Sequence, residues 1–452
     1  MVIDSLLNKA EDLQIANNNW GTIIVSNKEV NGEPTDQLCL TLCVEKKLPL
    51  GEISSPGDIF PDSVIVDGEV YSTDVVEMAE LSATGCYTLP NPANPESTWL
   101  MPVSGNRVEH RPLVGGISVG TIPPNGWGGG SVDTGTLGAL AVDLNDNTLV
   151  GVSNNHVLSK NTLAGDIGGA YTNDSGLTWW SYLSANDTTT SVGDDRYPVF
   201  QRSTYDEYSA SQSTMNNLKI GTVKNAYPFK STGNKLDVCT FALDTSVLNL
   251  TSTSVNWQQY LLDYNTPMDW ATNAEIQSLL TTELGAPVFR SGRTEGPVGY
   301  PGSEPYGTTC KLSAYAIGST NVSYGGNLGS IGFTDQIFFR SNKGSALSPS
   351  SGGDSGSFVC ALFNEGTALS AWKVIGLNFA GNGTIGVMNK ITNVSNMFKL
   401  SAYKGDPIDI GYKNYDMQVI ESRQSALTAM IGGKMYWQAG STGFPATTSF
   451  DT

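Results

Sequence analysis

Short runs of alternating apolar and polar residues fill much of the chain and are separated by glycine, asparagine and serine. Examples are GTLGALAVDL (135–144), LDVCTFALD (236–244) and WKVIGLNFAG (372–381). Such runs are typical of strands that bury one face, and many of them at regular spacing indicate an antiparallel barrel or sandwich. We therefore expect a mainly β domain over residues 113–400.

The regions on either side of this domain have different patterns. Apolar residues recur at helical spacing from Asp4 to Ala16 and four strand-like runs follow, which predicts a small α/β domain over residues 1–85. Residues 86–112 contain five prolines, whose missing N–H groups and fixed φ suit a linker. Residues 401–452 predict a C-terminal extension with a helix at 416–431 and a tail.

Charge and composition restrict the partners, the location and the cofactors that we expect. With 43 acidic and 25 basic residues the net charge is −18, which argues against a nucleic-acid partner because phosphate binding depends on clustered lysine and arginine. No apolar stretch is long enough to span a membrane, and the N-terminus lacks a signal-peptide pattern. We therefore expect an intracellular (cytoplasmic) or virion-associated protein. The six cysteines show no CxxC spacing, which favours free thiols, and we expect neither a metal nor a cofactor.

The stretch SGGDSGSFVC (351–360) raises the question of a nucleophilic serine. A serine hydroxyl needs a base, and the chain has only two histidines. His156 follows an apolar run and begins a loop, whereas His110 lies in the proline-rich stretch and is the weaker candidate. An acid must orient the imidazole. Asp237 precedes a strand-like run and is our choice, with Asp244 as the competing one.

The residues around Ser355 suit a turn that binds an oxyanion. Backbone N–H groups of Gly353 and Ser355 can point into one hollow, and glycine permits the φ values that such a turn requires. Asp354 is expected to support the turn rather than to react. A buried carboxylate there needs a partner, because an unpaired buried charge is costly.

The chain order His156, Asp237, Ser355 and the stretches LVGGISVG (113–120) and VIGLNFAGNGTIGVMNKI (374–391) resemble a trypsin-like (chymotrypsin-fold) serine peptidase. The stretches CVEKKLPLGEI (43–53), DVVE (74–77) and SGRTEG (291–296) more closely resemble intracellular bacterial and phage members that have an α/β domain before the barrels. The resemblance implies a two-barrel antiparallel domain that cleaves peptides or proteins through an acyl-enzyme. His156 would be the base, Asp237 its orienting acid and Ser355 the nucleophile, with the Gly353 and Ser355 amides as oxyanion donors.

The resemblance also suggests a specificity pocket and an activation site. Pro349 stands where an aspartate would select basic side chains, and with Phe379, Ala380 and Gly381 as a wall it predicts an uncharged pocket. RPLVGG resembles a zymogen activation site, at which a freed Leu113 would pair with Asp354. The required cut after Pro112 and the preceding α/β domain argue against such activation.

Two other interpretations compete. GNGTIG (381–386) matches a dinucleotide-binding glycine motif with Asp406 twenty residues on, but VMNKI after it reads as a strand where a helix should begin. A non-catalytic or latent scaffold of a virion or other assembly is the second alternative, since fold does not guarantee activity. Its partners would bind the N-terminal domain and the C-terminal tail.

Overall fold

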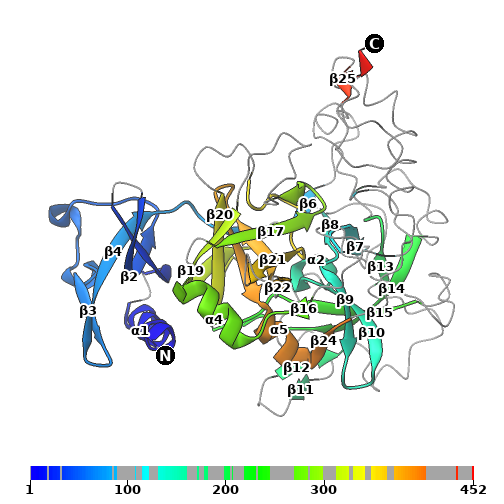
Figure 1. The fold of residues 1–452 in the computed structure, drawn as a ribbon, viewed down its shortest axis with the longest axis horizontal. Coiled ribbons are helices and arrows are strands. Elements are labelled where there is room, and N and C mark those ends of the chain that lie inside the picture. Colours follow the sequence, from blue (N-terminus) through cyan, green and yellow to red (C-terminus); the bar gives the residue numbers. More distant parts are fainter. Residues whose placement is uncertain are drawn as a thin grey trace.

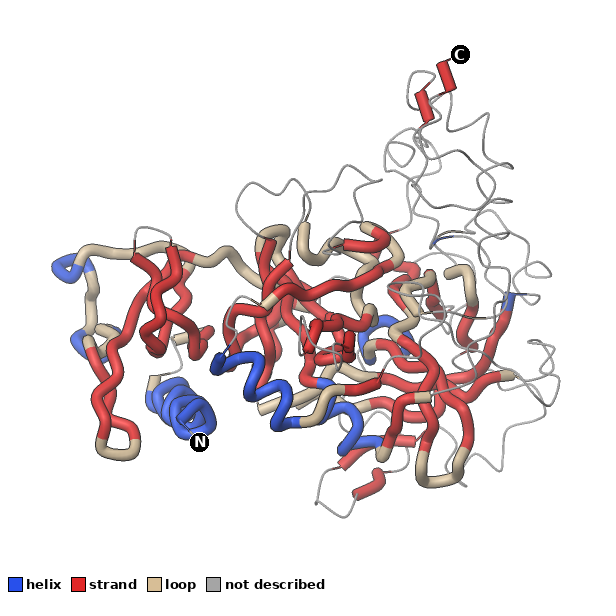
Figure 2. Tube along the Cα trace, in the orientation of Figure 1, coloured by secondary structure: helices blue, strands red, loops and turns tan. Residues whose placement is uncertain are grey.

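Strands dominate the computed structural model, as Figure 2 shows. The residues described are 2–17, 20–30, 33–83, 86–88, 107, 113, 115–121, 131–159, 170–172, 178–181, 198–203, 206, 218–230, 233–244, 269–282, 286–298, 312–324, 329–341, 348–363, 371–403, 434–435 and 450–451. Among them, no helix is long and apolar enough to cross a membrane.

The middle of the chain forms a closed antiparallel barrel, which we call the first barrel (cyan to green in Figure 1). Strand β8 pairs with β7 and continues through Leu137 and Gly138 into β9. From β9, each strand pairs with the next in the order β10, β15, β14 and β13. Strand β13 then pairs with β7, which closes the barrel. Its strands are β7 (Ser118–Thr121), β8 (Ser131–Thr136), β9 (Ala139–Asp143), β10 (Thr148–Ser153), β13 (Pro198–Phe200), β14 (Lys219–Ala226) and β15 (Cys239–Leu243).

The second barrel follows in the chain and is also closed. Pairing runs from β17 through β21, β22, β23 and β20 to β19, and β19 pairs again with β17. Its strands are β17 (Pro287–Gly292), β19 (Leu312–Ser323), β20 (Ser330–Ser341), β21 (Phe358–Phe363), β22 (Ala371–Gly381) and β23 (Ile385–Lys390). The predicted mainly β fold with two antiparallel barrels is therefore confirmed.

The N-terminal unit continues the sheet of the second barrel. Helix α1 (Val2–Ala16) packs Ile3, Leu6 and Ala10 into the buried core, and Figure 1 shows it beside the strands of this unit. Strand β1 pairs with β19 at Ala316–Ser319, beyond the part of β19 that closes the barrel. The other elements are β1 (Thr22–Val30), β2 (Glu33–Val44), the 3₁₀ turns η1 (Leu50–Glu52) and η2 (Pro56–Asp58), β3 (Ser63–Val66) and β4 (Glu69–Glu77).

Short elements connect these parts. Helix α5 (Ile391–Phe398) ends where Lys399 adopts φ 51°, and β24 (Leu400–Ala402) then pairs with β9, so the chain returns from the second barrel to the first. Thr272 and Glu275 cap α4 reciprocally. The remaining elements are β5 (Ser82–Ala83), β6 (Cys86–Thr88), β11 (Ala170–Thr172), β12 (Thr178–Ser181), α2 (Asn155–Leu158), β16 (Asp269–Trp270), α4 (Asn273–Thr282), β18 (Gly296–Val298), β25 (Lys434–Met435) and β26 (Phe450–Asp451).

The structure changes one boundary expected from the sequence and agrees with the rejection of the dinucleotide-binding motif. The linker expected from residue 86 begins with a strand, because β6 pairs with β8 and the first proline comes only at Pro90. GNGTIG joins the antiparallel strands β22 and β23, so it does not open the helix that a dinucleotide site requires. His110, the helix expected at 416–431 and most of the C-terminal extension lie outside the described residues.

The junction of β1 and β19 is sensitive to side-chain size. A Cβ atom at Gly318 would lie 2.3 Å from the Ile23 carbonyl oxygen and 2.6 Å from the Ile24 Cα. We expect Gly318→Val to lower the free energy of unfolding by about 2 kcal/mol through overpacking, measured by urea denaturation. Gly51→Ala, where no atom lies within 4 Å of the added Cβ, should change it by less than about 0.5 kcal/mol. Equal effects would contradict this description of the junction.

Candidate active site

His156 and Asp237 meet at one end of the first barrel. His156 lies in the single turn of α2 directly after β10, and both side chains are almost completely buried. The distance from His156 Nδ1 to Asp237 Oδ2 is 2.5 Å, and the backbone N–H of His156 donates to Asp237 Oδ1 at 3.2 Å. An ionised carboxylate only accepts hydrogen bonds, so Nδ1 carries the proton and Nε2 of the neutral ring is left as the acceptor. His156 Nε2 has no hydrogen-bond partner among the described residues.

Both barrels hold Asp237 in place. Tyr324 Oη donates to Asp237 Oδ2 at 2.8 Å, and the Asp237 backbone N–H donates to Asn389 Oδ1 at 2.9 Å. From the first barrel, Asn154 Nδ2 donates to the Asp237 carbonyl at 2.6 Å. Burial, followed by the neighbouring Asp237 charge, raises the pKa of Tyr324 well above its usual value, so its hydroxyl remains a proton donor. No motif or spacing in the sequence pointed to these three supporting residues.

Asp244, the competing acid, lies at the opposite end of the strand. In the antiparallel register Ser153 pairs with Cys239, at the end of β15 nearest His156. Asp244 follows the other end of β15, and a strand advances about 3.3 Å per residue. The structure therefore brings His156 together with Asp237 and not with Asp244.

Ser355 lies in a tight turn that leads into β21. The backbone N–H of Asp354 donates to the Ser351 carbonyl at 3.0 Å, and that of Gly356 donates to the Asn378 carbonyl at 2.8 Å. Gly353 and Gly356 have φ of 94° and 93°, in the region that favours glycine. A Cβ at Gly353 would also lie 2.6 Å from Thr294 Oγ1. The positive φ therefore favours glycine at both positions, and at Gly353 a larger residue would also collide with Thr294.

The turn packs against the first barrel beside His156. The Thr136 backbone N–H donates to the Ser355 carbonyl at 2.8 Å. A Cβ at Gly135 would lie 2.6 Å from Val157, the residue after His156, and 2.8 Å from the Ser355 carbonyl oxygen. The Ser355 hydroxyl donates to the Phe379 carbonyl at 3.0 Å. The structure thus places the Ser355 turn near Val157, the residue after His156, with the Ser355 hydroxyl directed at Phe379.

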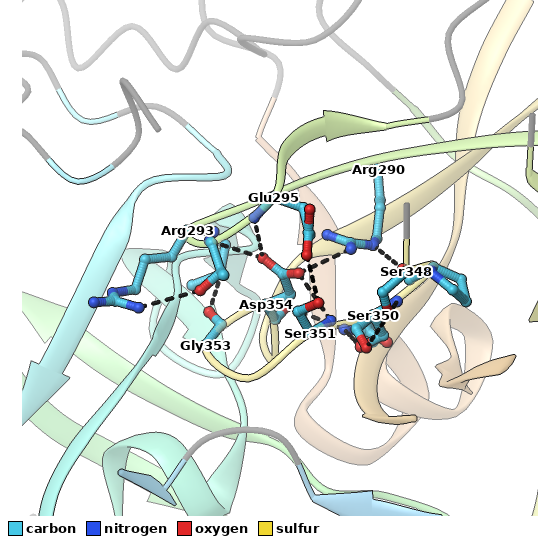
Figure 3. A network of polar contacts seen from close by, with 12 residues as sticks. Arg290, Arg293, Glu295, Ser348, Ser350, Ser351, Gly353 and Asp354 are labelled. Carbon is cyan, nitrogen blue, oxygen red and sulfur yellow. Dashed lines mark hydrogen bonds and ion pairs between the residues drawn. The ribbon is translucent and has the colours of Figure 1, made fainter. Parts of the chain in front are cut away.

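Asp354 has its partner in Arg290 of β17, as Figure 3 shows. Arg290 Nη2 lies 2.8 Å from Asp354 Oδ2, and both side chains have no exposed surface. The other carboxylate oxygen accepts from the backbone N–H groups of Thr294 and Glu295 at 2.8 and 3.1 Å. The carboxylate is therefore satisfied within the folded chain, and a freed terminus at Leu113 is not needed to pair with it.

A second ion pair joins the residues that follow β17 to the first barrel. Arg293, which follows β17, pairs with Asp206, and Asp206 also accepts from the Ser118 hydroxyl of β7. Burial acts to raise the pKa of Asp206, but the Arg293 guanidinium and the hydrogen bonds outweigh it and hold the pKa below its usual value. Asp206 thus stays charged and ties the turn after β17 to the first barrel.

The four residues expected to line a specificity pocket are all buried. The Pro349 carbonyl accepts from Arg290 Nε, and the Phe379 ring lies 4.8 Å from that of Phe333. Ala380 and Gly381 pair with Ala83 and Ser82 of β5. Of the four, Phe379 contacts Ser355 through its carbonyl, and the role of the four residues in specificity stays a prediction.

The four cysteines whose side chains the structure describes, Cys39, Cys43, Cys239 and Cys360, are buried and form no disulfide bond. Burial raises the pKa of Cys43 to about 12. In the described part of the chain, no group of three or more histidine, cysteine, aspartate or glutamate side chains could hold a metal ion.

Three solved structures of proteases are similar to the chain. No family model and no curated protein matches the chain. Similar solved structures include a glutamic acid specific serine protease that uses a histidine triad in substrate binding, with 11% identity, a TM-score of 0.31 and coverage of 64% of this chain and 100% of that one. Thermobifida fusca protease A has 13% identity, a TM-score of 0.29 and coverage of 65% and 98%. Cellulomonas bogoriensis chymotrypsin has 14% identity, a TM-score of 0.30 and coverage of 64% and 98%. At such values these similarities carry no argument, and the two-barrel assignment rests on the strand pairing of this chain.

The Arg290–Asp354 pair should matter strongly for stability. Arg290→Met leaves a buried carboxylate without its cation, which costs about 3–5 kcal/mol, and urea denaturation should show a loss of this size. Arg340→Met removes the partly exposed pair with Glu29 and should cost about 1 kcal/mol or less. Adding Asp354→Asn to Arg290→Met should recover part of the loss. Equal losses in the two single variants would contradict a structural role for the buried pair.

Proposed function

We propose that the chain is a serine endopeptidase that hydrolyses peptide bonds through an acyl-enzyme on Ser355. The observation that carries this proposal is the buried His156–Asp237 pair, whose acceptor nitrogen Nε2 has no partner among the described residues, beside a glycine-dependent turn that presents a serine. A base, the acid that orients it and a nucleophile are the three parts that such chemistry needs.

The first half of the reaction makes an acyl-enzyme. The Ser355 hydroxyl turns from the Phe379 carbonyl to His156 Nε2, a rotation between staggered side-chain positions. Catalytic hydrogen bonds often tighten only when substrate binds. Ser355 Oγ attacks the scissile carbonyl while Nε2 takes its proton. The backbone N–H groups of Gly353 and Ser355 hold the oxyanion, and Nε2 returns the proton to the leaving amine as the C–N bond breaks.

The second half releases the acid product. Water attacks the ester carbon, His156 takes its proton, and the tetrahedral intermediate collapses with return of that proton to Ser355 Oγ. Asp237 stabilises the imidazolium in both halves. Tyr324 and Asn389 fix the Asp237 carboxylate and backbone, so the imidazole returns to the same neutral tautomer after each half of the cycle.

We also propose a class of substrate and a cellular location. The substrate is a peptide or protein with an uncharged side chain before the cut, accepted by Pro349, Phe379, Ala380 and Gly381. We place the protein with intracellular bacterial or phage trypsin-like peptidases, in the cytoplasm or a virion. Residues 1–85 and 401–452 would be its regions for binding assembly partners.

Hydrolysis of p-nitrophenyl acetate tests the nucleophile, because this small ester needs no extended binding edge. Ser355→Ala should keep the fold and lower kcat/KM by about three orders of magnitude. Ser357→Ala, in the same turn region and equally buried, is the matched control and should keep nearly full activity. Retained hydrolysis in Ser355→Ala would reject the assignment. A folded wild-type protein without activity would favour the scaffold alternative.

A pair of aspartate variants tests the orienting acid with the same ester. Asp237→Asn cannot hold the imidazole in the required tautomer and should lower kcat by at least about two orders of magnitude. Asp244→Asn, at the far end of β15, should leave kcat nearly unchanged. The opposite ranking would show that Asp244 is the acid.

A further inference from the structure

The edge of β22 next to Ser355 is occupied by the chain itself. Strand β21 pairs along this edge as far as Leu377, and Asn378 continues the ladder by bonding to Gly356 and Ser357. The Phe379 carbonyl then accepts the Ser355 hydroxyl. The next two residues of β22, Ala380 and Gly381, pair with Ala83 and Ser82 of β5.

The direction of β5 leads toward the nucleophile. Because β5 is antiparallel to β22, its chain advances from Gly381 to Ala380, and the next position along the edge is the one where Ser355 contacts Phe379. The chain resumes at β6, which pairs with β8 of the first barrel, the strand whose Thr136 binds the Ser355 carbonyl. The described residues on either side of this gap thus pair with different barrels, β5 with the second and β6 with the first.

Several contacts anchor the residues before and within β5. The Leu81 carbonyl accepts from the Ser323 backbone N–H at 2.8 Å, and the Ala79 carbonyl accepts from Asn382 Nδ2 at 2.9 Å. Leu81 is only 2% exposed and belongs to the apolar cluster that contains Phe229, Phe333 and Phe379. We call residues 79–83 the docked segment.

An extended peptide substrate needs this same edge. A strand edge offers backbone donors and acceptors to a peptide of any sequence, and neighbouring pockets then select side chains. The edge of β22 nearest Ser355 is the one along which a bound peptide would bring its next carbonyl toward the nucleophile, and the docked segment already pairs there. A protein substrate must displace it.

We propose that the docked segment is a built-in competitor that limits access of protein substrates to the candidate active site. This inference rests on the proposed peptidase function. Only residues 78–81 separate β5 from β4 of the N-terminal unit, and that unit is held to the second barrel through β1 and β19. A segment tethered so closely competes at an effective concentration on the order of millimolar. Movement of the N-terminal unit would therefore regulate the peptidase.

Two substrates separate the competitor from the chemistry. Leu81→Asp removes the apolar anchor and should raise kcat/KM for fluorescein-labelled casein about tenfold, as expected if roughly nine-tenths of the wild-type molecules are docked. Hydrolysis of p-nitrophenyl acetate, which needs no strand edge, should stay unchanged. Leu50→Asp, at a residue of the N-terminal unit that is 72% exposed, is the matched control and should alter neither rate.

The outcomes distinguish this inference from the proposed function. Ester hydrolysis that depends on Ser355, with the same casein rate in wild type and Leu81→Asp, would reject the competitor and keep the peptidase. No Ser355-dependent ester hydrolysis would reject the peptidase itself. An intact-mass measurement should find the wild-type chain uncut, and a cut between Ala83 and Cys86 would make the segment a substrate instead of a competitor.

A milder variant covers the case in which Leu81→Asp does not fold. In Leu81→Ala, amide hydrogen exchange of residues 79–83 should accelerate about tenfold or more, while exchange in the β21–β22 core stays at the wild-type rate. Unchanged exchange in the docked segment would contradict anchoring by Leu81.

Discussion

The buried ion pair between Arg290 and Asp354 is the constraint on which the candidate site depends. It places two opposite charges in the interior at 2.8 Å with no exposed surface, an arrangement that is stable only when further hydrogen bonds satisfy the groups. The carboxylate accepts three backbone N–H groups, two from the turn after β17 and one from Ser351. One carboxylate therefore joins the turn after β17 to the turn that contains Ser355.

Residues from both barrels position the candidate site. The first barrel supplies the imidazole and the acid, and the second supplies the serine turn and the groups that hold Asp237, namely Tyr324 and Asn389. The contact of Thr136 with Ser355 and the ion pair of Arg293 with Asp206 fix one barrel against the other. A relative shift of the barrels would therefore move His156 relative to the Ser355 turn.

Local pattern in the sequence predicted much of this structure. Alternating apolar runs identified the barrel strands, and the scarcity of histidine together with the Gly/Ser turn selected His156 and Ser355. The supporting residues were not predictable in this way. Arg290 lies 64 residues before Asp354, and Tyr324 lies 87 residues after Asp237, so only the folded chain shows that they meet. The pairing of β1 with β19 and the position of β5 on β22 are likewise set by strand edges that alternation does not specify.

Reaction with diisopropyl fluorophosphate, followed by proteolytic digestion and mass spectrometry, tests the central claim most directly. An assembled base and oxyanion hollow activate one serine, so the account predicts a single adduct on the peptide that contains Ser355, absent in Ser355→Ala and retained in Ser357→Ala. A folded wild-type protein without an adduct, or with its adduct on another residue, would contradict the assignment of Ser355 as the nucleophile.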